Sequence, residues 1–158
     1  MKQSLKKSLI KISIVSFIIL FFASCSGERR SLLEPEFTVS TPVYKSAEED
    51  DRCMTGGVYF DFYNRSETDV VFLEVRMNVY ESDTGKAAFL QGAQITSESE
   101  VYVKAGEKRN MCISLDPYIT VAPKAPYVID QFYVRRIVYS DGSEWRDDAG
   151  LYAIGSGK

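Results

Sequence analysis

The chain has 158 residues, with 19 lysines and arginines against 22 aspartates and glutamates, a net charge of −3 and no histidine. The lack of histidine removes the commonest general base and metal ligand, and with it Ser-His-Asp and Cys-His catalysis. No GxGxxG or GxxxxGK[ST] motif is present to bind phosphates, and an acidic chain gives no electrostatic reason to bind nucleic acid. We therefore expect no enzyme, no cofactor and no metal site.

The first 24 residues have the pattern of an export signal. Basic residues open the segment, an apolar run covers residues 12–22, and Ala23 and Ser24 stand directly before Cys25. A charged start, a short apolar run and small residues before a cut are typical of a secretory signal, whereas a permanent transmembrane helix needs about 20 apolar residues. We expect cleavage before Cys25. Ordinary secretion without lipid and an uncleaved anchor are the alternatives.

The residues Phe22-Ala23-Ser24-Cys25 resemble the lipobox of bacterial lipoproteins. The resemblance implies that Cys25 carries diacylglycerol and a further acyl chain such as palmitate, and becomes the first residue of the mature protein. A single acyl chain binds a membrane only marginally, with K on the order of 10⁴ M⁻¹, while several chains anchor stably. The expected location is the cell envelope, on the inner or the outer membrane of a bacterium, with the lipid on Cys25 as the membrane contact.

Cys53 and Cys112 are the only other cysteines. In an exported protein such a pair predicts a disulfide, which would stabilise the fold by roughly 4 kcal/mol in the chain-entropy model. Two unpaired thiols in a poorly oxidising compartment are the alternative. The disulfide is preferred because nothing in the sequence orients a reactive thiolate.

After a lipidated tether at residues 25–36, a first strand is predicted over residues 37–44, where Pro42 confines it to an edge or an end. Four consecutive acids follow at 48–51. Such a run is typical of a solvated loop. A calcium site is the alternative, although the spacing matches no known calcium loop.

The clearest signal is a period of two. Apolar residues alternate with mostly polar ones over residues 58–63 and again over 71–80, and the polar segment 64–69 joins the two runs. This pattern predicts a hairpin of two strands, each with one dry face. Further strands are predicted at 87–90, 100–103, 110–115 and about 129–139, with a proline-containing connection at 116–126.

About seven short strands without a convincing helix predict an all-β, antiparallel sandwich over residues 37–150, followed by a frayed tail at 151–158. Residues 58–64, the strand to Tyr80, and the turns 83–86 and 104–107 resemble the immunoglobulin-like domains of bacterial envelope proteins, notably the FxLYD type. The resemblance implies an immunoglobulin-like fold with a binding or scaffolding role.

Aromatic residues are numerous, with 10 tyrosines and 9 phenylalanines. We expect several of those on predicted strands to line the core or cover sheet edges, with an adhesive surface patch as the alternative; they are Tyr59, Tyr63, Phe72, Tyr80, Tyr133 and Tyr139. Trp145 is expected to pack on the sandwich. Arg135 and Arg136 are adjacent, so one should point toward the core or lie at an edge, snorkelling or paired with a carboxylate.

The expected function is a non-catalytic protein-binding or structural module that meets an envelope protein partner through a loop end or a sheet edge. The alternative is an envelope carrier or sensor for a small ligand, with an apolar pocket between the sheets. A carboxylate-only hydrolase needs two acids about 5–10 Å apart in a cleft, and a chain of this size leaves little room for one.

Overall fold

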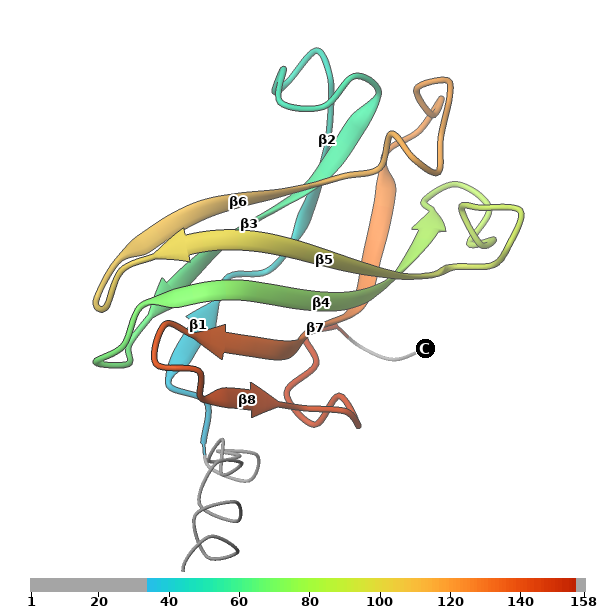
Figure 1. Ribbon diagram of the computed structural model, residues 1–158. Coiled ribbons are helices and arrows are strands. Elements are labelled where there is room, and N and C mark those ends of the chain that lie inside the picture. The colour runs from blue at the N-terminus through green and yellow to red at the C-terminus, as the bar shows by residue number, and fades with distance from the viewer. Residues whose placement is uncertain (1–33, 156–158) are drawn as a thin grey trace, which may run out of the picture.

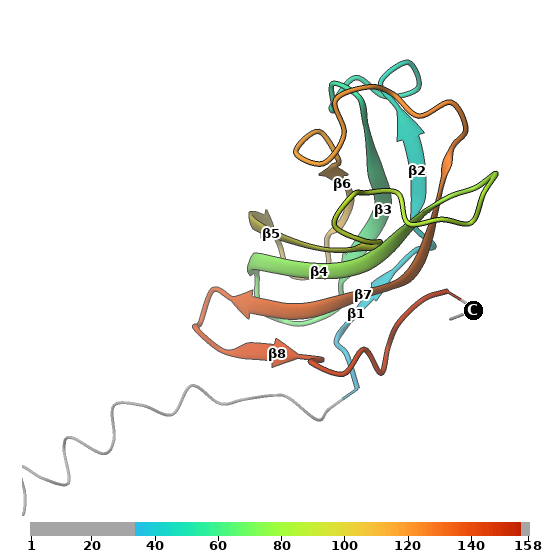
Figure 2. The same ribbon diagram turned by 90° about the vertical axis from the view of Figure 1, so that its right-hand side faces the viewer.

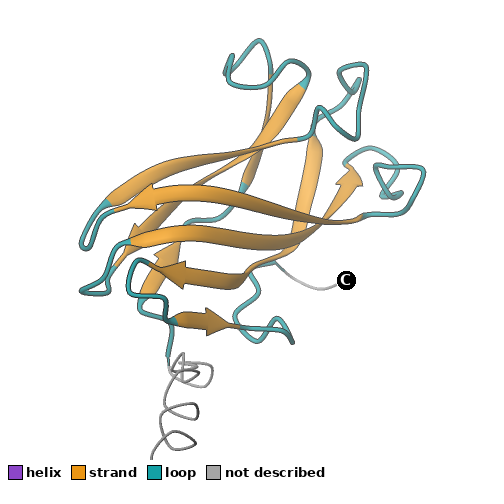
Figure 3. Cartoon of the chain, viewed as in Figure 1, coloured by secondary structure: helices purple, strands orange, loops and turns teal. Residues whose placement is uncertain are grey.

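The computed structural model describes residues 34–155. The leader 1–24, Cys25 and most of the tether 25–36 lie outside the described residues, as do residues 156–158. Within the described range the chain forms strands and loops and contains no helix (Figure 3). Accordingly, no helix in that range is long and apolar enough to cross a membrane.

Eight strands form two antiparallel sheets that pack face to face (Figure 1). This confirms the predicted all-β sandwich, with one strand more than expected. The strands are β1 (Phe37–Val39), β2 (Val43–Ser46), β3 (Gly56–Asn64), β4 (Val70–Glu81), β5 (Gln94–Val103), β6 (Lys108–Ser114), β7 (Tyr127–Tyr139) and β8 (Glu144–Arg146).

Two strands had no separate prediction: β8, and the second of the two strands into which the predicted strand 37–44 is divided. Both β1 and β2 pair with the same side of β3, β1 near its end and β2 near its beginning. Pro42 lies between them and has no N–H to donate to a ladder. The backbone therefore leaves β3 there and returns one residue later, at Val43. The predicted strand at 87–90 forms only two isolated bridges, from Ala87 to Tyr80 and from Phe89 to Gly92.

The strand order is immunoglobulin-like. One sheet has β3 at its centre, flanked by β1 and β2 on one side and β6 on the other, and the second sheet has the order β5-β4-β7-β8. The second and fifth strands of an immunoglobulin domain likewise share one sheet, while the third, sixth and seventh strands form the other. Here β3 and β6 correspond to the former pair, and β4, β7 and β8 to the latter set.

The alternating residues of β3 and β4 build the core as predicted. Every second side chain of each strand points between the sheets and is almost fully buried; the set comprises Val58, Phe60, Phe62, Leu73, Val75, Met77 and Val79. Phe60 of one sheet meets Phe132 of the other, with ring centroids 4.8 Å apart. The interior between the sheets is therefore filled by side chains.

Strand β7 departs from strict alternation at two places. Its register against β4 slips near Gln131, the described non-glycine residue with a left-handed φ (48°), and again at Arg135 and Arg136. An extra residue in one strand is a β-bulge, which turns two neighbouring side chains to the same face. The inference that one of the two arginines must point toward the core or an edge is therefore wrong. The expected pairing with a carboxylate is confirmed for both arginines, Arg135 with Glu74 and Arg136 with Glu144.

The two ends of the sandwich differ. The described chain begins at Glu34 beside the short turns 65–69, 104–107 and 140–143, because β1 pairs with the end of β3. Arg65 fixes this entry, since its backbone N–H donates to the Glu36 carbonyl. The long loops 47–55, 82–93 and 115–126 lie at the opposite end (Figures 1 and 2), which we call the loop end.

Candidate functional site: the covered cysteine pair and the loop end

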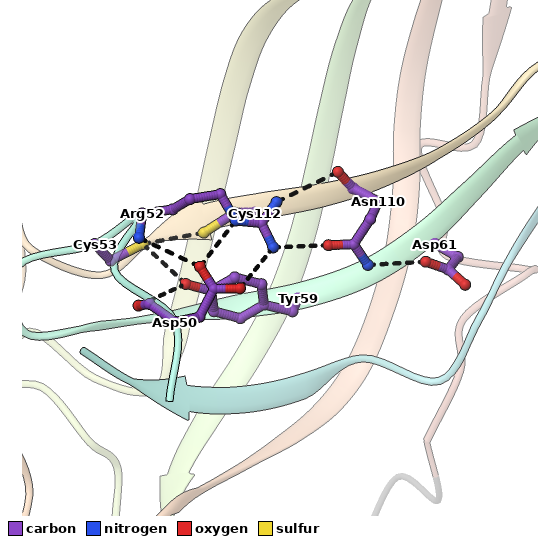
Figure 4. Close-up of polar contacts among 7 residues, drawn as sticks. All are labelled: Asp50, Arg52, Cys53, Tyr59, Asp61, Asn110 and Cys112. Atoms are coloured by element: carbon purple, nitrogen blue, oxygen red, sulfur yellow. Dashed lines mark hydrogen bonds and ion pairs between the residues drawn. The ribbon is translucent and has the colours of Figure 1, made fainter. Parts of the chain in front are cut away.

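The loop 47–55 folds back over the outer face of the β3–β6 pair. Tyr59 of β3 lies directly opposite Cys112 of β6, and both side chains point away from the core. Tyr59 is nevertheless only 1% exposed, because residues of the loop cover its ring (Figure 4). A strand face that alternation predicts to be wet is therefore dry at this position.

The two cysteines meet beneath this cover. Cys53 is buried, and its Sγ lies 3.0 Å from Sγ of Cys112. Gly57 makes room for them, because a Cβ at this position would lie 2.6 Å from Sγ of Cys53 and 2.9 Å from Sγ of Cys112. Both residues are free thiols in this structure, and their separation exceeds an S–S bond by about 1 Å. The structure thus brings the predicted partners together without the predicted disulfide.

The thiols lie in an environment that disfavours their ionisation. Burial raises the pKa of Cys112 to about 11, and the contact with Cys53 adds to this effect. Burial and the neighbouring sulfurs also raise the pKa of Tyr59. Nucleophilic cysteines have the opposite property, a pKa lowered by nearby positive charge or a helix N-terminus. The pair has the character of a structural element.

Arg52 closes the cover from outside. Its guanidinium carbon lies 4.6 Å from the centroid of the Tyr59 ring, and its Nε and Nη2 each donate to a carboxylate oxygen of Asp50 at 2.9 Å. Nη2 also donates to Oδ1 of Asn110 at 2.7 Å, and Asn110 donates in turn to Asp61 at 2.8 Å (Figure 4). The hydrogen bonds from Arg52 hold the pKa of Asp50 well below its usual range.

Asp116 fastens the same loop from its other side. Its carboxylate accepts hydrogen bonds from the backbone N–H of Met54 at 2.9 Å, from the N–H of Thr55 at 2.7 Å and from the Thr55 hydroxyl at 2.6 Å. These bonds, that from the Thr55 side chain most of all, lower the pKa of Asp116. Loop 47–55 is thereby tied both to β6 and to the start of the connection that follows β6.

The acidic run 48–51 belongs to this loop. Glu49 accepts hydrogen bonds from the backbone N–H and hydroxyl of Ser46 at 2.9 and 3.2 Å, and Asp50 is engaged by Arg52. Across residues 34–155 no group of three or more histidine, cysteine or acidic side chains is placed to hold a metal ion. Two of the four acids thus act as local partners that shape the loop.

Among the other predicted residues, Trp145 packs on the sandwich as expected. It is 3% exposed and meets the ring of Phe37 edge-on, with centroids 4.9 Å apart. Of the strand aromatics, Tyr133 and Tyr139 are buried as Tyr59 is, and Tyr63 is exposed. Phe72 and Tyr80 are half-buried, so three of the six rings are buried, and of these Tyr139 belongs to the core between the sheets.

The expected tail is partly attached to the body. Asp147 is buried and accepts hydrogen bonds from the backbone N–H groups of Leu151 and Tyr152 at 2.9 and 3.0 Å. Ile154 then bridges to Phe132 of β7 through its backbone. Ordered contacts of the sandwich thus continue to about Gly155.

The loop end is closed by aromatic rings and carries exposed apolar side chains. Tyr44 meets Tyr127 at 5.1 Å, and Phe89 meets Tyr118 at 5.2 Å, so rings from both sheets and two long loops lie together. Around them the loops expose apolar side chains to solvent; these are Met54 (87% exposed), Leu90 (108%) and Val121 (78%). Each of the three long loops thus exposes at least one large apolar side chain at this end of the sandwich.

Sequence reasoning identified Cys53 and Cys112 but missed Gly57, Tyr59 and Arg52 as their surroundings. The Gly56-Gly57 pair at the start of a strand was the available signal, because glycine in a strand often marks the close approach of another group. Comparison with protein-family models, with curated proteins and with solved structures gave no match.

Proposed function

We propose that this protein is a bacterial lipoprotein, anchored through lipid on Cys25, whose β-sandwich presents its loop end to a protein partner in the cell envelope. The anchor rests on the lipobox-like residues before Cys25. The sandwich acts as a non-catalytic binding module, and the likeness of residues 58–64 and 83–86 to FxLYD-type domains is part of the proposal.

The main support for this role is that the entry of the described chain and the long loops lie at opposite ends of the sandwich. The described chain enters beside the short turns, and the long loops with Met54, Leu90 and Val121 lie at the far end. A domain held at its entry therefore directs its apolar loop tips away from the bilayer. Exposed apolar patches mark sites of protein interaction, and the three loops that carry these side chains share one end of the domain.

The filled interior favours a protein partner over a small ligand. A carrier needs an apolar pocket between the sheets, whereas here Phe60, Phe132 and their neighbours occupy that space. The raised pKa of Cys112 also argues against thiol-based catalysis.

Photo-crosslinking in the intact envelope tests the proposal. A benzophenone amino acid is placed at Leu90 or at Val121 of the full-length protein in the bacterium that encodes it. Both are exposed at the loop end. We expect a discrete crosslinked protein from each position. The matched control is Ala105, which is exposed in a turn at the entry end. Equal crosslinking from Ala105, or none from the two loop positions, would reject the role of the loop end.

A further inference from the structure

The two sulfurs beneath loop 47–55 are placed for a covalent bond. Cys53 and Cys112 are 59 residues apart in sequence, yet their Sγ atoms lie 3.0 Å apart in a pocket that Gly57 leaves open. Within the described residues no third side chain joins them to form a metal site. We propose that Cys53 and Cys112 form a structural disulfide in the exported protein, and that this bond fixes loop 47–55 to the outer face of β6.

The bond requires an oxidant, which we take to be the disulfide of an envelope thiol oxidoreductase. One cysteine attacks that disulfide as its thiolate and forms a mixed disulfide, and the second cysteine then displaces the oxidoreductase. Two S–H bonds are lost and one S–S bond forms in this protein. The two electrons reduce the oxidoreductase disulfide to two thiols, and the protons are conserved between the two pairs.

The surroundings favour a permanent bond over a reversible one. Cys53 is buried and Cys112 is half-buried, and the loop that carries Cys53 is held in place by the bonds of Arg52 to Asp50 and Asn110. Thiol–disulfide exchange requires a reductant to reach a sulfur. A bond formed before this loop is fixed is therefore protected once the domain is folded.

The inference does not depend on partner binding, only on export to an oxidising compartment, and its test is separate from crosslinking. The full-length protein is isolated from the envelope with free thiols blocked by N-ethylmaleimide at lysis, and is then digested with trypsin without reductant. We expect peptide 53–65 joined to peptide 110–124, and the two released after reduction. Recovery of both peptides singly, each carrying the maleimide, would overturn the proposal.

Whether the bond holds loop 47–55 in place is measured separately, by the rate at which trypsin cleaves after Arg52 in the folded protein. We expect Cys112→Ser to speed this cleavage severalfold and to lower the unfolding midpoint by roughly 10 °C or more. Thr96→Ser, an exposed change on β5, should match the wild type. Unchanged cleavage in Cys112→Ser would show that the bond does not hold the loop.

Gly57→Ala provides a variant that retains both cysteines. Its added Cβ would lie within 3.0 Å of both sulfurs, so the fraction of crosslinked peptide should fall well below that of the wild type. A full yield of the joined peptides in Gly57→Ala would overturn the role given to Gly57. If any variant fails to fold, the peptide analysis of the wild-type protein still decides whether the bond exists.

Discussion

Arg52 and Tyr59 form a stacked pair on the outside of the sandwich, with the guanidinium carbon 4.6 Å from the ring centroid. Tyr59 belongs to β3 and Arg52 to the loop that precedes it. Their contact therefore joins an irregular segment to a regular one. A cation–π pair contributes about 0.5–1 kcal/mol when exposed and more when desolvated.

Removing the Tyr59 ring should destabilise the domain strongly. Tyr59→Ala leaves a cavity beneath the loop in place of a side chain that is 1% exposed, and we expect a loss of about 3–5 kcal/mol in the free energy of unfolding. Tyr59→Phe retains the ring and should cost less than about 1 kcal/mol. Urea denaturation of both variants gives the comparison. Similar losses in the two would mean that the hydroxyl, not the ring, matters.

A charge on the dry face of β4 should prevent folding. Val75 is 2% exposed in the core, so Val75→Asp buries a carboxylate without a partner, at a cost of several kcal/mol. The control is Thr96→Asp, because Thr96 is exposed on the neighbouring strand β5. Circular dichroism and thermal melting should show an unfolded Val75→Asp protein and a folded control. A native melting curve for Val75→Asp would contradict the assignment of the buried face.

Substitution of Glu74, on the outer face of β4, should lower the stability of the domain more than substitution of an exposed acid nearby. Its side chain is 7% exposed, and it accepts a hydrogen bond at 2.5 Å from Nη1 of Arg135. Glu74→Gln weakens this pair, and we expect a loss of about 1–2 kcal/mol because Arg135 remains partly in solvent. Glu98→Gln, at the exposed position opposite on β5, should cost less than about 0.5 kcal/mol. Equal effects would show that burial of Glu74 is unimportant.

The hydrogen bonds from loop 47–55 to the Asp116 carboxylate should stabilise the protein less at acidic pH. Its pKa is lowered in the folded protein by the bonds from Thr55 and Met54, so it contributes stability above the pKa of the unfolded chain, about 3.9. That contribution is lost as the pH falls below this value. The difference in melting temperature between the wild type and Asp116→Asn should therefore shrink between pH 7 and about pH 3. A difference that grows in acid would refute this assignment.

The proposed anchor makes a separate prediction. Cys25→Ala should give an unprocessed precursor, because the modified cysteine defines the cut. Metabolic labelling with a fatty acid should mark the wild-type protein and not the variant. Equal labelling of both proteins would place the lipid elsewhere or exclude it.

Much of the fold followed from alternation in the sequence. The strands around Phe60 and Val75 were predicted because their apolar residues recur at every second position, and the structure buries those residues between the sheets. Strand β7 was harder to predict, since the bulge at Arg135 and Arg136 depends on its pairing with β4. Sequence alone does not contain that register.

At the candidate site, too, some features could be predicted from the sequence and others could not. Two cysteines in an exported chain suggest each other as partners, so Cys53 and Cys112 could be paired in advance. The burial of Tyr59 could not be predicted, because it depends on a loop that crosses the sheet and is fixed by Asp116, a residue distant in sequence. Long-range hydrogen bonds from irregular segments leave no periodic signal.

The placement of β1 has a mechanical consequence. This strand lies along β3 and begins at the entry of the described chain, so tension between a fixed N-terminus and a partner at the far loops would run lengthwise through it. Force along the strand loads all the backbone hydrogen bonds between β1 and β3 at the same time, whereas force across the strand would break them one after another. The sandwich would therefore transmit force through its first strand with all of those bonds engaged at once.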